Sequence, residues 1–224
     1  MTVVEPTLEV EHALFAEGAP VVIGCDEVGR GAIAGVVAVG VCAIVPGGEA
    51  PPAGLRDSKL LSPAKREHLA PLVREWAAAV AVGEAEPGEV DAHGIVAALG
   101  LAARRGLIAL HESGIDVGAS TVLLDGSHDW LTPALRTPPS IRVRPKADRD
   151  CASVAAASVV AKVHRDALMV ADAGLWPHFG WEGNKGYGSA AHLAAVAAHG
   201  PSPRHRVTWL RLPAATGGAR DVTV

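Results

Sequence analysis

Two long apolar runs near the start of the chain, separated by a short polar loop, constrain the fold most strongly. Residues 21–25 (VVIGC) and 34–45 (AGVVAVGVCAIV) are rich in β-branched residues and have the character of buried strands. Only residues 26–33 connect them, and parallel neighbours would need a much longer helical crossover. The two runs therefore predict an antiparallel pair.

The rest of the chain alternates helical and extended patterns. An amphipathic helix with Ser62 as its N-cap is predicted over residues 62–79, and a second helix over 88–111 is expected to break near Gly94 and Gly100. Further strands are predicted around residues 79–84, 120–126 and 141–145, and further helices over 151–172 and 189–200. This order predicts an α/β fold with a mixed sheet flanked by helices.

Composition narrows the class of protein. The 224 residues are 49% hydrophobic, which suits one domain with a sizeable core. The net charge of −4 argues against an indiscriminate binder of polyanions. No apolar run is long enough to cross a bilayer, and the first residues are acidic where a signal peptide is basic, so a cytoplasmic protein is expected. Cys25, Cys42 and Cys151 show no C-x-x-C spacing and are predicted to be buried thiols.

Acidic residues stand where predicted strands end or a predicted helix begins. Asp26 and Glu27 follow the first apolar run, Asp125 follows a later one, and Asp148 and Asp150 precede the alanine-rich helix. Each has a simpler explanation, because aspartate is common in turns and stabilises helix N-termini. Open α/β sheets, however, bind ligands at the carboxyl ends of strands. The pattern therefore permits these acids to converge on one site.

Converging carboxylates would repel one another unless they held a cation. Hard oxygen ligands suit Mg²⁺ or Mn²⁺. Two such ions ~3.5–4 Å apart would activate water and stabilise the leaving oxygen of a phosphodiester. The acids thus permit phosphodiester hydrolysis without establishing it.

Six blocks of the sequence resemble those of bacterial ribonuclease HII, a type 2 ribonuclease H, in the same order. They extend from Gly24 to about Leu212 and so cover nearly the whole chain. The blocks are DEVGRG (26–31), DSKLLSPAKREHL (57–69), LLDG (123–126), KADRDCASVAAASVVAKVHRD (146–166), KGYGSAAH (185–192) and HRVTW (205–209).

The resemblance implies which acids act in catalysis. The catalytic residues, and the ligands of Mg²⁺ or Mn²⁺, would be Asp26, Glu27, Asp125 and Asp148. The spacing from Asp148 to Lys162 matches the family, which favours Asp148 over Asp150. Ala147 replaces a glycine common in the family, and it would shift Asp148 slightly if that position required a positive φ.

The resemblance also implies a set of substrate-binding residues: Gly29, Arg30, Gly31, Lys59, Lys146 and Tyr187. The backbone of the loop 29–31 would contact the 2′-hydroxyl that distinguishes RNA from DNA, because glycine lets a backbone approach a sugar closely. Tyr187 would pack on the sugar at an RNA–DNA junction, although in isolation it could equally be a half-buried core aromatic. Positions rich in basic residues in the family are occupied here by Lys59, Lys146, Lys162 and Arg165. Some of these would contact phosphates and others would hold the acidic cluster together, and Lys59 and Lys146 are the first candidates.

The implied activity is that of a metal-dependent endoribonuclease. It would hydrolyse RNA in RNA–DNA hybrids and cut 5′ of ribonucleotides embedded in duplex DNA by two-metal-ion catalysis, leaving 3′-hydroxyl and 5′-phosphate ends. These nucleic acids would be its partners, with no membrane, and the chain is expected to be a monomer. The implied architecture is a ribonuclease H-like core over residues 18–172 and a small helical, substrate-contacting C-terminal region over 173–212, with flanking tails 1–17 and 213–224.

Three alternatives compete with this interpretation. Ribonuclease HIII shares much of the catalytic pattern but usually carries a substantial N-terminal binding domain, whereas 25 residues precede Asp26. A non-catalytic nucleic-acid-binding module would not require the four acids. A dinucleotide-binding fold would place G-x-G-x-x-G after the first strand, and the loop there does not match it. Ribonuclease HII remains the favoured interpretation.

Overall fold

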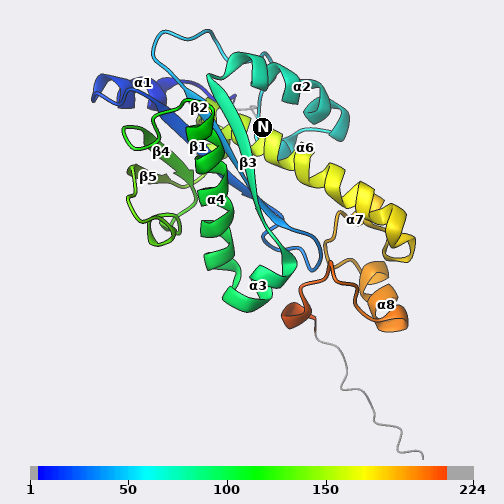
Figure 1. The fold of residues 1–224 in the computed structure, drawn as a ribbon. Coiled ribbons are helices and arrows are strands. Elements are labelled where there is room, and N and C mark those ends of the chain that lie inside the picture. The colour runs from blue at the N-terminus through cyan, green and yellow to red at the C-terminus, as the bar shows by residue number, and fades with distance from the viewer. Residues whose placement is uncertain (1–4, 211–224) are drawn as a thin grey trace, which may run out of the picture.

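Five strands form one mixed sheet with the order β3-β2-β1-β4-β5 (Figure 1). The structure is a computed structural model, and it describes residues 5–210. The pairs β1–β2 and β2–β3 are antiparallel, and the pairs β1–β4 and β4–β5 are parallel. The strands are β1 (Val22–Val28), β2 (Val37–Ile44), β3 (Ala79–Ala85), β4 (Thr121–Asp125) and β5 (Ser140–Arg144). The predicted α/β class and the antiparallel first pair are both confirmed.

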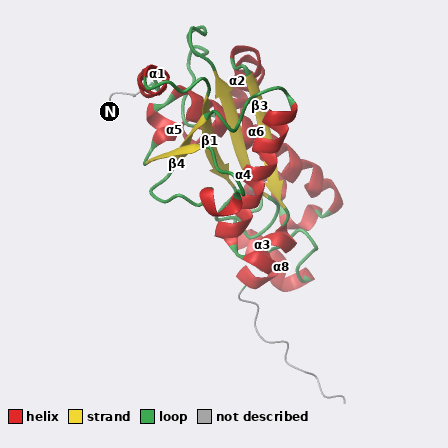
Figure 2. Cartoon of the chain, turned by 60° about the vertical axis from the view of Figure 1, so that its left-hand side comes forward, coloured by secondary structure: helices red, strands yellow, loops and turns green. Residues whose placement is uncertain are grey.

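Helices cover both faces of this sheet (Figures 1 and 2). Helices α2 and α6 pack with the sheet in one core, and α4 packs with its other face in a second core. The α-helices are α1 (Glu9–Ala16), α2 (Pro63–Trp76), α3 (Pro87–His93), α4 (Ile95–Glu112), α5 (Ala147–Asp150), α6 (Ala152–Leu175), α7 (Trp181–Asn184) and α8 (Ala190–His199). Short 3₁₀ turns are η1 (Ser58–Leu60), η2 (Thr132–Ala134), η3 (Pro177–Phe179) and η4 (Val207–Trp209).

Helix boundaries follow the local sequence signals in most places. The Ser62 side chain accepts a hydrogen bond from the Lys65 N–H, which confirms the predicted N-cap of α2. Gly94 separates α3 from α4 with a φ of 78°, as expected. The predicted break near Gly100 is wrong, because Gly100 is buried inside α4. A Cβ there would lie 2.6 Å from the Cβ of Ala134, so this glycine serves close packing.

The alternation of side chains along β1 assigns them to two cores. Val22 belongs to the core shared with α6, and Ile23 and Cys25 belong to the core shared with α4. Because successive side chains of a strand point to opposite faces, Asp26 points to the α6 face and Glu27 to the α4 face. Both faces are covered, which explains why these strands appear as continuous apolar runs.

Two glycines let α6 lie close against the sheet. A Cβ at Gly24 would stand 2.2 Å from the Ser153 backbone, and one at Gly40 would stand 2.2 Å from the Ala157 carbonyl oxygen. The alanine-rich face of α6 therefore contacts β1 and β2 almost backbone to backbone. This contact also draws α5, which directly precedes α6, towards the carboxyl end of β1.

Helix α1 lies within the segment 1–17 that the sequence analysis assigned to a flanking tail, and the analysis missed it. Glu11 is fully buried and accepts hydrogen bonds from the backbone N–H and hydroxyl of Ser153 at 2.9 and 2.8 Å. Burial raises the pKa of Glu11 despite these bonds. The domain boundaries stay predictions, and the predicted tail 213–224 lies outside the described residues.

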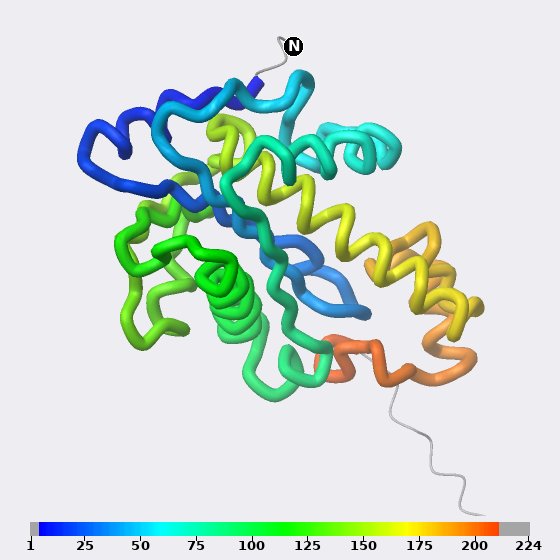
Figure 3. Tube along the Cα trace, turned by 45° about the horizontal axis from the view of Figure 1, so that its top comes forward, coloured from blue at the N-terminus to red at the C-terminus, as the bar shows by residue number. Residues whose placement is uncertain are grey.

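The C-terminal region packs beyond the C-terminal end of α6 (Figure 3). Its small core includes Phe179, Trp181 and Val196 together with Met169 of α6. This arrangement confirms the small helical C-terminal appendage of the predicted fold. Within residues 5–210, no helix is long and apolar enough to span a bilayer. The three cysteines are buried free thiols, as predicted.

Candidate active site

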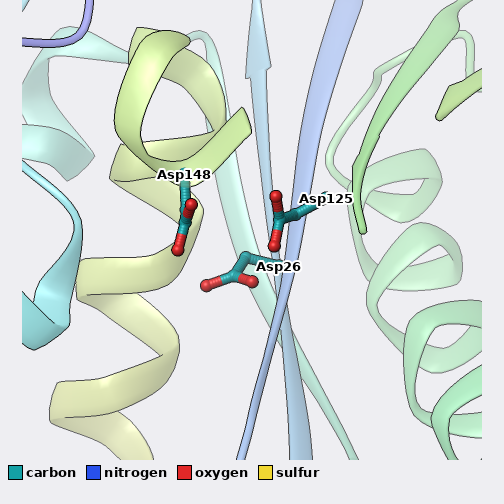
Figure 4. Close-up of side chains that lie close together, drawn as sticks. All are labelled: Asp26, Asp125 and Asp148. Atoms are coloured by element: carbon teal, nitrogen blue, oxygen red, sulfur yellow. The ribbon is translucent and has the colours of Figure 1, made fainter. Parts of the chain in front are cut away.

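Three of the four predicted acids converge at the carboxyl end of the β1–β4 pair. Carboxylate oxygens of Asp26, Asp125 and Asp148 all lie within 4.8 Å of one another, and Figure 4 shows the three side chains pointing together. Asp26 lies in β1, which continues to Val28 and is thus longer than predicted. Cys25 is in register with Leu124 in the parallel pair, so Asp26 and Asp125 are neighbours on one face.

Glu27 approaches the same place from the other face of β1. It is not a member of the group of three, and its carboxylate lies 3.3 Å from the Arg30 guanidinium. It lines the same small cavity as Asp26 and Asp125, and its negative charge raises the pKa values of both. The alternation of strand side chains accounts for this separation.

The electrostatics of the group favour a bound cation. Asp26 is 1% exposed, and its Oδ2 has no hydrogen-bond partner within the described residues. Burial raises the pKa of Asp26 well above its usual value, and Lys59 offsets this only in part. Burial and the Asp148 charge likewise raise the pKa of Asp125, although the Ala147 N–H donates to it at 2.8 Å. Buried, mutually repelling carboxylates, of which Asp26 has an oxygen without a partner among the described residues, fit a hard divalent ion.

Lys59 connects this group to a fifth acid. Its ammonium lies 3.0 Å from Asp148 Oδ2 and 3.9 Å from Asp57 Oδ1. Burial disfavours the charged lysine, but Asp26, Asp57 and Asp148 together outweigh burial and raise its pKa. Asp57 is itself 5% exposed, accepts a hydrogen bond from the Lys59 N–H at 2.9 Å, and has a pKa raised by burial. Asp57 thereby fixes the turn that carries Lys59.

Most predicted site residues line one small cavity of about 180 Å³, here called the central cavity. The loop 29–31 forms one wall. Gly29 has a φ of 82°, and a Cβ there would lie 2.0 Å from Arg165 Nε, so the fold itself requires this glycine. A Cβ on Gly31 would meet nothing within 4 Å. The lining residues are Asp26, Glu27, Val28, Gly29, Arg30, Gly31, Ser58, Lys59, Asp125, Lys162 and Tyr187.

Tyr187 and Lys146 are placed differently from each other. The Tyr187 ring is 39% exposed at the edge of the central cavity, with the Arg165 guanidinium 5.6 Å from its centroid. Lys146 is exposed and is not among the residues that line this cavity. Lys146 itself has the positive φ in this segment, 62°, whereas Ala147 is helical. Alanine at position 147, in place of the glycine common in the family, therefore does not require Asp148 to shift.

Larger hollows flank the central cavity on both sides. The first, about 900 Å³, shares Glu27, Arg30 and Asp125 with it and extends along α4. The second, about 910 Å³, shares Lys162 and Tyr187 with it and lies between α2 and α6. Asp26, Glu27 and Asp125 thus line a cavity that shares walls with two larger hollows, an arrangement that suits a long ligand better than a small one.

Two residues at the site escaped the sequence analysis: Asp57 and Arg206. Asp57 lies in a quoted block but resembles an ordinary turn residue. Arg165, which was expected to contact a phosphate or the acidic cluster, is buried on the stripe of α6 that also carries Ala161 and Met169. No local pattern marks Arg206 as buried.

Comparison with known proteins extends these observations. The family model for Ribonuclease HII matches residues 23–212. The Ribonuclease HII of Streptomyces avermitilis is 48% identical over 211 residues, covering 93% of this chain and 85% of that protein. The Ribonuclease HII of Thermus thermophilus is 47% identical over 185 residues, covering 83% and 84%.

Solved structures agree on the fold. The ribonuclease H2 from Pyrococcus horikoshii OT3 superposes with a TM-score of 0.65 at 26% identity, over 84% of this chain and 93% of that chain. A Bst-RNase HIII in complex with Mn²⁺ superposes with a TM-score of 0.68 at 21% identity, over 92% and 71%, and supports the fold alone.

The mixed sheet and its convergent carboxylates define a ribonuclease H-like, metal-dependent hydrolase. Within that class, the chain belongs to the ribonuclease HII family. It is an endoribonuclease that hydrolyses RNA in RNA–DNA hybrids. The family assignment confirms the recognition made from the six sequence blocks. The monomeric state and the cytoplasmic location stay predictions.

Proposed function

We propose that the protein also incises duplex DNA at embedded ribonucleotides. The cut falls on the 5′ side of the ribonucleotide and leaves 3′-hydroxyl and 5′-phosphate ends. The observation that carries this proposal is the convergence of Asp26, Asp125 and Asp148 beside a loop whose backbone is open to a sugar. A cluster that held metal without such a loop would cut without examining the sugar.

The four acids would bind metal from both sides of β1. Asp26, Asp125 and Asp148 provide ligands from the α6 face, and Glu27 adds a carboxylate from the α4 face. When bound, two Mg²⁺ or Mn²⁺ ions supply an activated water and neutralise charge on the leaving oxygen. Lys59 holds Asp148 in place through the 3.0 Å ion pair and stays protonated at neutral pH.

The loop 29–31 and Tyr187 examine the sugar. Open space beside Gly31 lets a ribose approach the backbone, where N–H groups contact the 2′-hydroxyl and the adjoining phosphate. The half-exposed ring of Tyr187 packs on the next sugar at the RNA–DNA junction. The two flanking hollows accommodate the strand on either side, and exposed Lys146 contacts a phosphate outside the central cavity.

The test is cleavage of an end-labelled DNA duplex that contains one ribonucleotide, beside an all-DNA duplex. Reactions contain Mg²⁺, Mn²⁺ or EDTA, and the product ends are mapped. We expect metal-dependent cutting at the phosphate 5′ of the ribonucleotide and an intact control duplex. Asp125→Asn serves as the matched negative control, because it removes one anionic ligand and should keep the fold. Cutting on the 3′ side, or equal cutting of both duplexes, would refute the proposal.

A further inference from the structure

Within residues 5–210, two arginines are fully buried and form no ion pair with a carboxylate. Arg165 and Arg206 are both 0% exposed, and neither forms an ion pair with an acid within residues 5–210. Burial and the charge of Arg165 lower the pKa of Arg206 to about 10, so its guanidinium is still charged at neutral pH. Buried charges are rare unless they are well compensated. The compensation here comes from backbone carbonyl groups.

Arg206 donates all of its side-chain hydrogen bonds to the loop that follows β1. Its Nη2 bonds the Gly29 carbonyl at 2.8 Å and the Gly35 carbonyl at 3.1 Å, and its Nη1 bonds the Arg30 carbonyl at 2.9 Å. One planar guanidinium therefore binds two successive carbonyl groups of the loop 29–31. Arg165 acts on neighbouring segments, through the carbonyl groups of Ala34, Val36 and Lys185.

These bonds fix the direction of two backbone N–H groups. In a planar trans peptide, the N–H points opposite to the carbonyl of the preceding residue. Because the carbonyls of Gly29 and Arg30 point inward to Arg206, the N–H groups of Arg30 and Gly31 point outward. Neither donates a hydrogen bond within the described part of the chain. Successive free N–H groups of this kind form a concavity that binds anions.

The position of Arg206 is itself fixed from three sides. Its own N–H donates to the Ile33 carbonyl at 2.8 Å, which attaches it to the same loop. Asp91 of α3 accepts hydrogen bonds from the N–H groups of Val207 and Thr208 at 2.8 and 3.1 Å. The ring of Trp209 lies 5.2 Å from the guanidinium. The side chain is thus held rigidly beneath the loop.

We propose that Arg206 is a positioning residue that sets the preference for ribonucleotides, by aiming the N–H groups of Arg30 and Gly31 at the 2′-hydroxyl and its adjoining phosphate. The inference rests on the proposed function of the loop 29–31. Arg206 touches no substrate atom. It acts by orienting the loop and by placing a positive charge beneath it.

Arg206→Lys separates geometry from charge. Lysine keeps the positive charge, but its single ammonium cannot replace a planar fork that bonds three carbonyl groups. The Gly29 carbonyl then keeps only its bond from the Ala32 N–H at 3.2 Å, and the Arg30 carbonyl loses its partner. The two N–H groups thereby lose their common direction. Arg206→Met removes the charge as well and should have at least as large an effect.

The experiment measures binding by fluorescence anisotropy in EDTA, where no cleavage occurs. Two labelled duplexes are compared, one with a single ribonucleotide and one entirely of DNA. The wild type should bind the first more tightly. Arg206→Lys should reduce that preference by about 10-fold or more, since hydrogen bonds to a charged group are lost, with the affinity for all-DNA duplex unchanged. Leu110→Ala, in the α4-side core away from the central cavity, controls for reduced stability and should keep the preference.

The outcomes separate this inference from the proposed function. Loss of preference in Arg206→Lys but not in Leu110→Ala supports the inference. An unchanged preference in Arg206→Lys, equal losses for both duplexes, or a wild type with no preference would overturn it. A wild type that prefers the ribonucleotide in binding but does not cut it in Mg²⁺ or Mn²⁺ would refute the proposed function and leave the role of Arg206 intact.

Discussion

Replacing Asp26 with asparagine should stabilise the metal-free protein and abolish its nuclease activity. Asp26 is buried, its Oδ2 has no hydrogen-bond partner among the described residues, and burial raises its pKa well above 3.8. A raised carboxyl pKa means that the ionised form is less stable in the folded protein than in the unfolded chain. Asparagine has nearly the same shape without the charge, so the folded state should gain stability.

The magnitude is bounded by the titration of a free carboxyl group. Protonating a group with a pKa of 3.8 at pH 7 costs about 4 kcal/mol, which is the largest gain available. The asparagine variant also loses the attraction between Asp26 and Lys59, so we expect a net gain of about 1–3 kcal/mol. Asp150→Asn is the matched control, since Asp150 is partly exposed in an ion pair with Arg144 and such pairs contribute little.

The assay is chemical denaturation at pH 7 in EDTA and again in Mn²⁺. In EDTA, Asp26→Asn should be more stable than the wild type. Saturating Mn²⁺ should reverse this order, because an ion at 1,000 times its dissociation constant adds about 4.1 kcal/mol to the protein that binds it, which exceeds the expected gain. A variant that is less stable than the wild type in EDTA, or that still cuts an RNA–DNA hybrid, would refute the reasoning.

Three further predictions concern the substrate edge, the packing and the pH dependence. Tyr187→Ala should weaken discrimination at RNA–DNA junctions and leave Mn²⁺ binding intact, and equal cleavage of junction substrates by variant and wild type would remove Tyr187 from the site. Gly24→Ala should destabilise the fold by about 1–3 kcal/mol or more in denaturation, because its Cβ would overlap the Ser153 backbone; an unchanged midpoint would contradict the close contact of α6 with β1. Burial and the charge of His192 lower the pKa of His205 from 6.5 to about 4 in the folded protein. Between pH 6.5 and 4, His205 is therefore protonated in the unfolded chain and neutral in the folded protein. Stability should therefore fall by about 3 kcal/mol as the pH decreases through that window, and His205→Gln should flatten the dependence.

The sequence predicted the elements of the fold because their local signals are strong. Long apolar runs specified β1 and β2, and the alternation of helices and strands specified the class. The pairing of β1 with β4 could not be predicted from local sequence signals, since nearly a hundred residues separate the two strands in the chain. Helix α1 was missed because it is short and acidic, with Glu9 and Glu11 in its first turn, although it buries Leu14 in the core and Glu11 against Ser153.

Residues that bind through their own side chains were easier to find than residues that hold others in place. Asp26 and Asp125 follow predicted strands and Asp148 precedes a predicted helix, where chemistry is expected. Arg165 and Arg206 donate to backbone carbonyl groups more than 100 positions away, apart from one bond to Lys185. Every residue carries a backbone carbonyl group, so the sequence does not indicate which ones accept these bonds, and only the folded structure reveals such contacts.

The central claim is that Asp26, Asp125 and Asp148 hold the metal that cleaves the phosphodiester. The most direct test is a crystal structure of the protein soaked in Mn²⁺, with anomalous scattering used to locate the ion. We expect an anomalous peak bounded by these three carboxylates, and we expect that peak to be lost in Asp125→Asn. A manganese peak elsewhere, with none at the three carboxylates in an active protein, would contradict it.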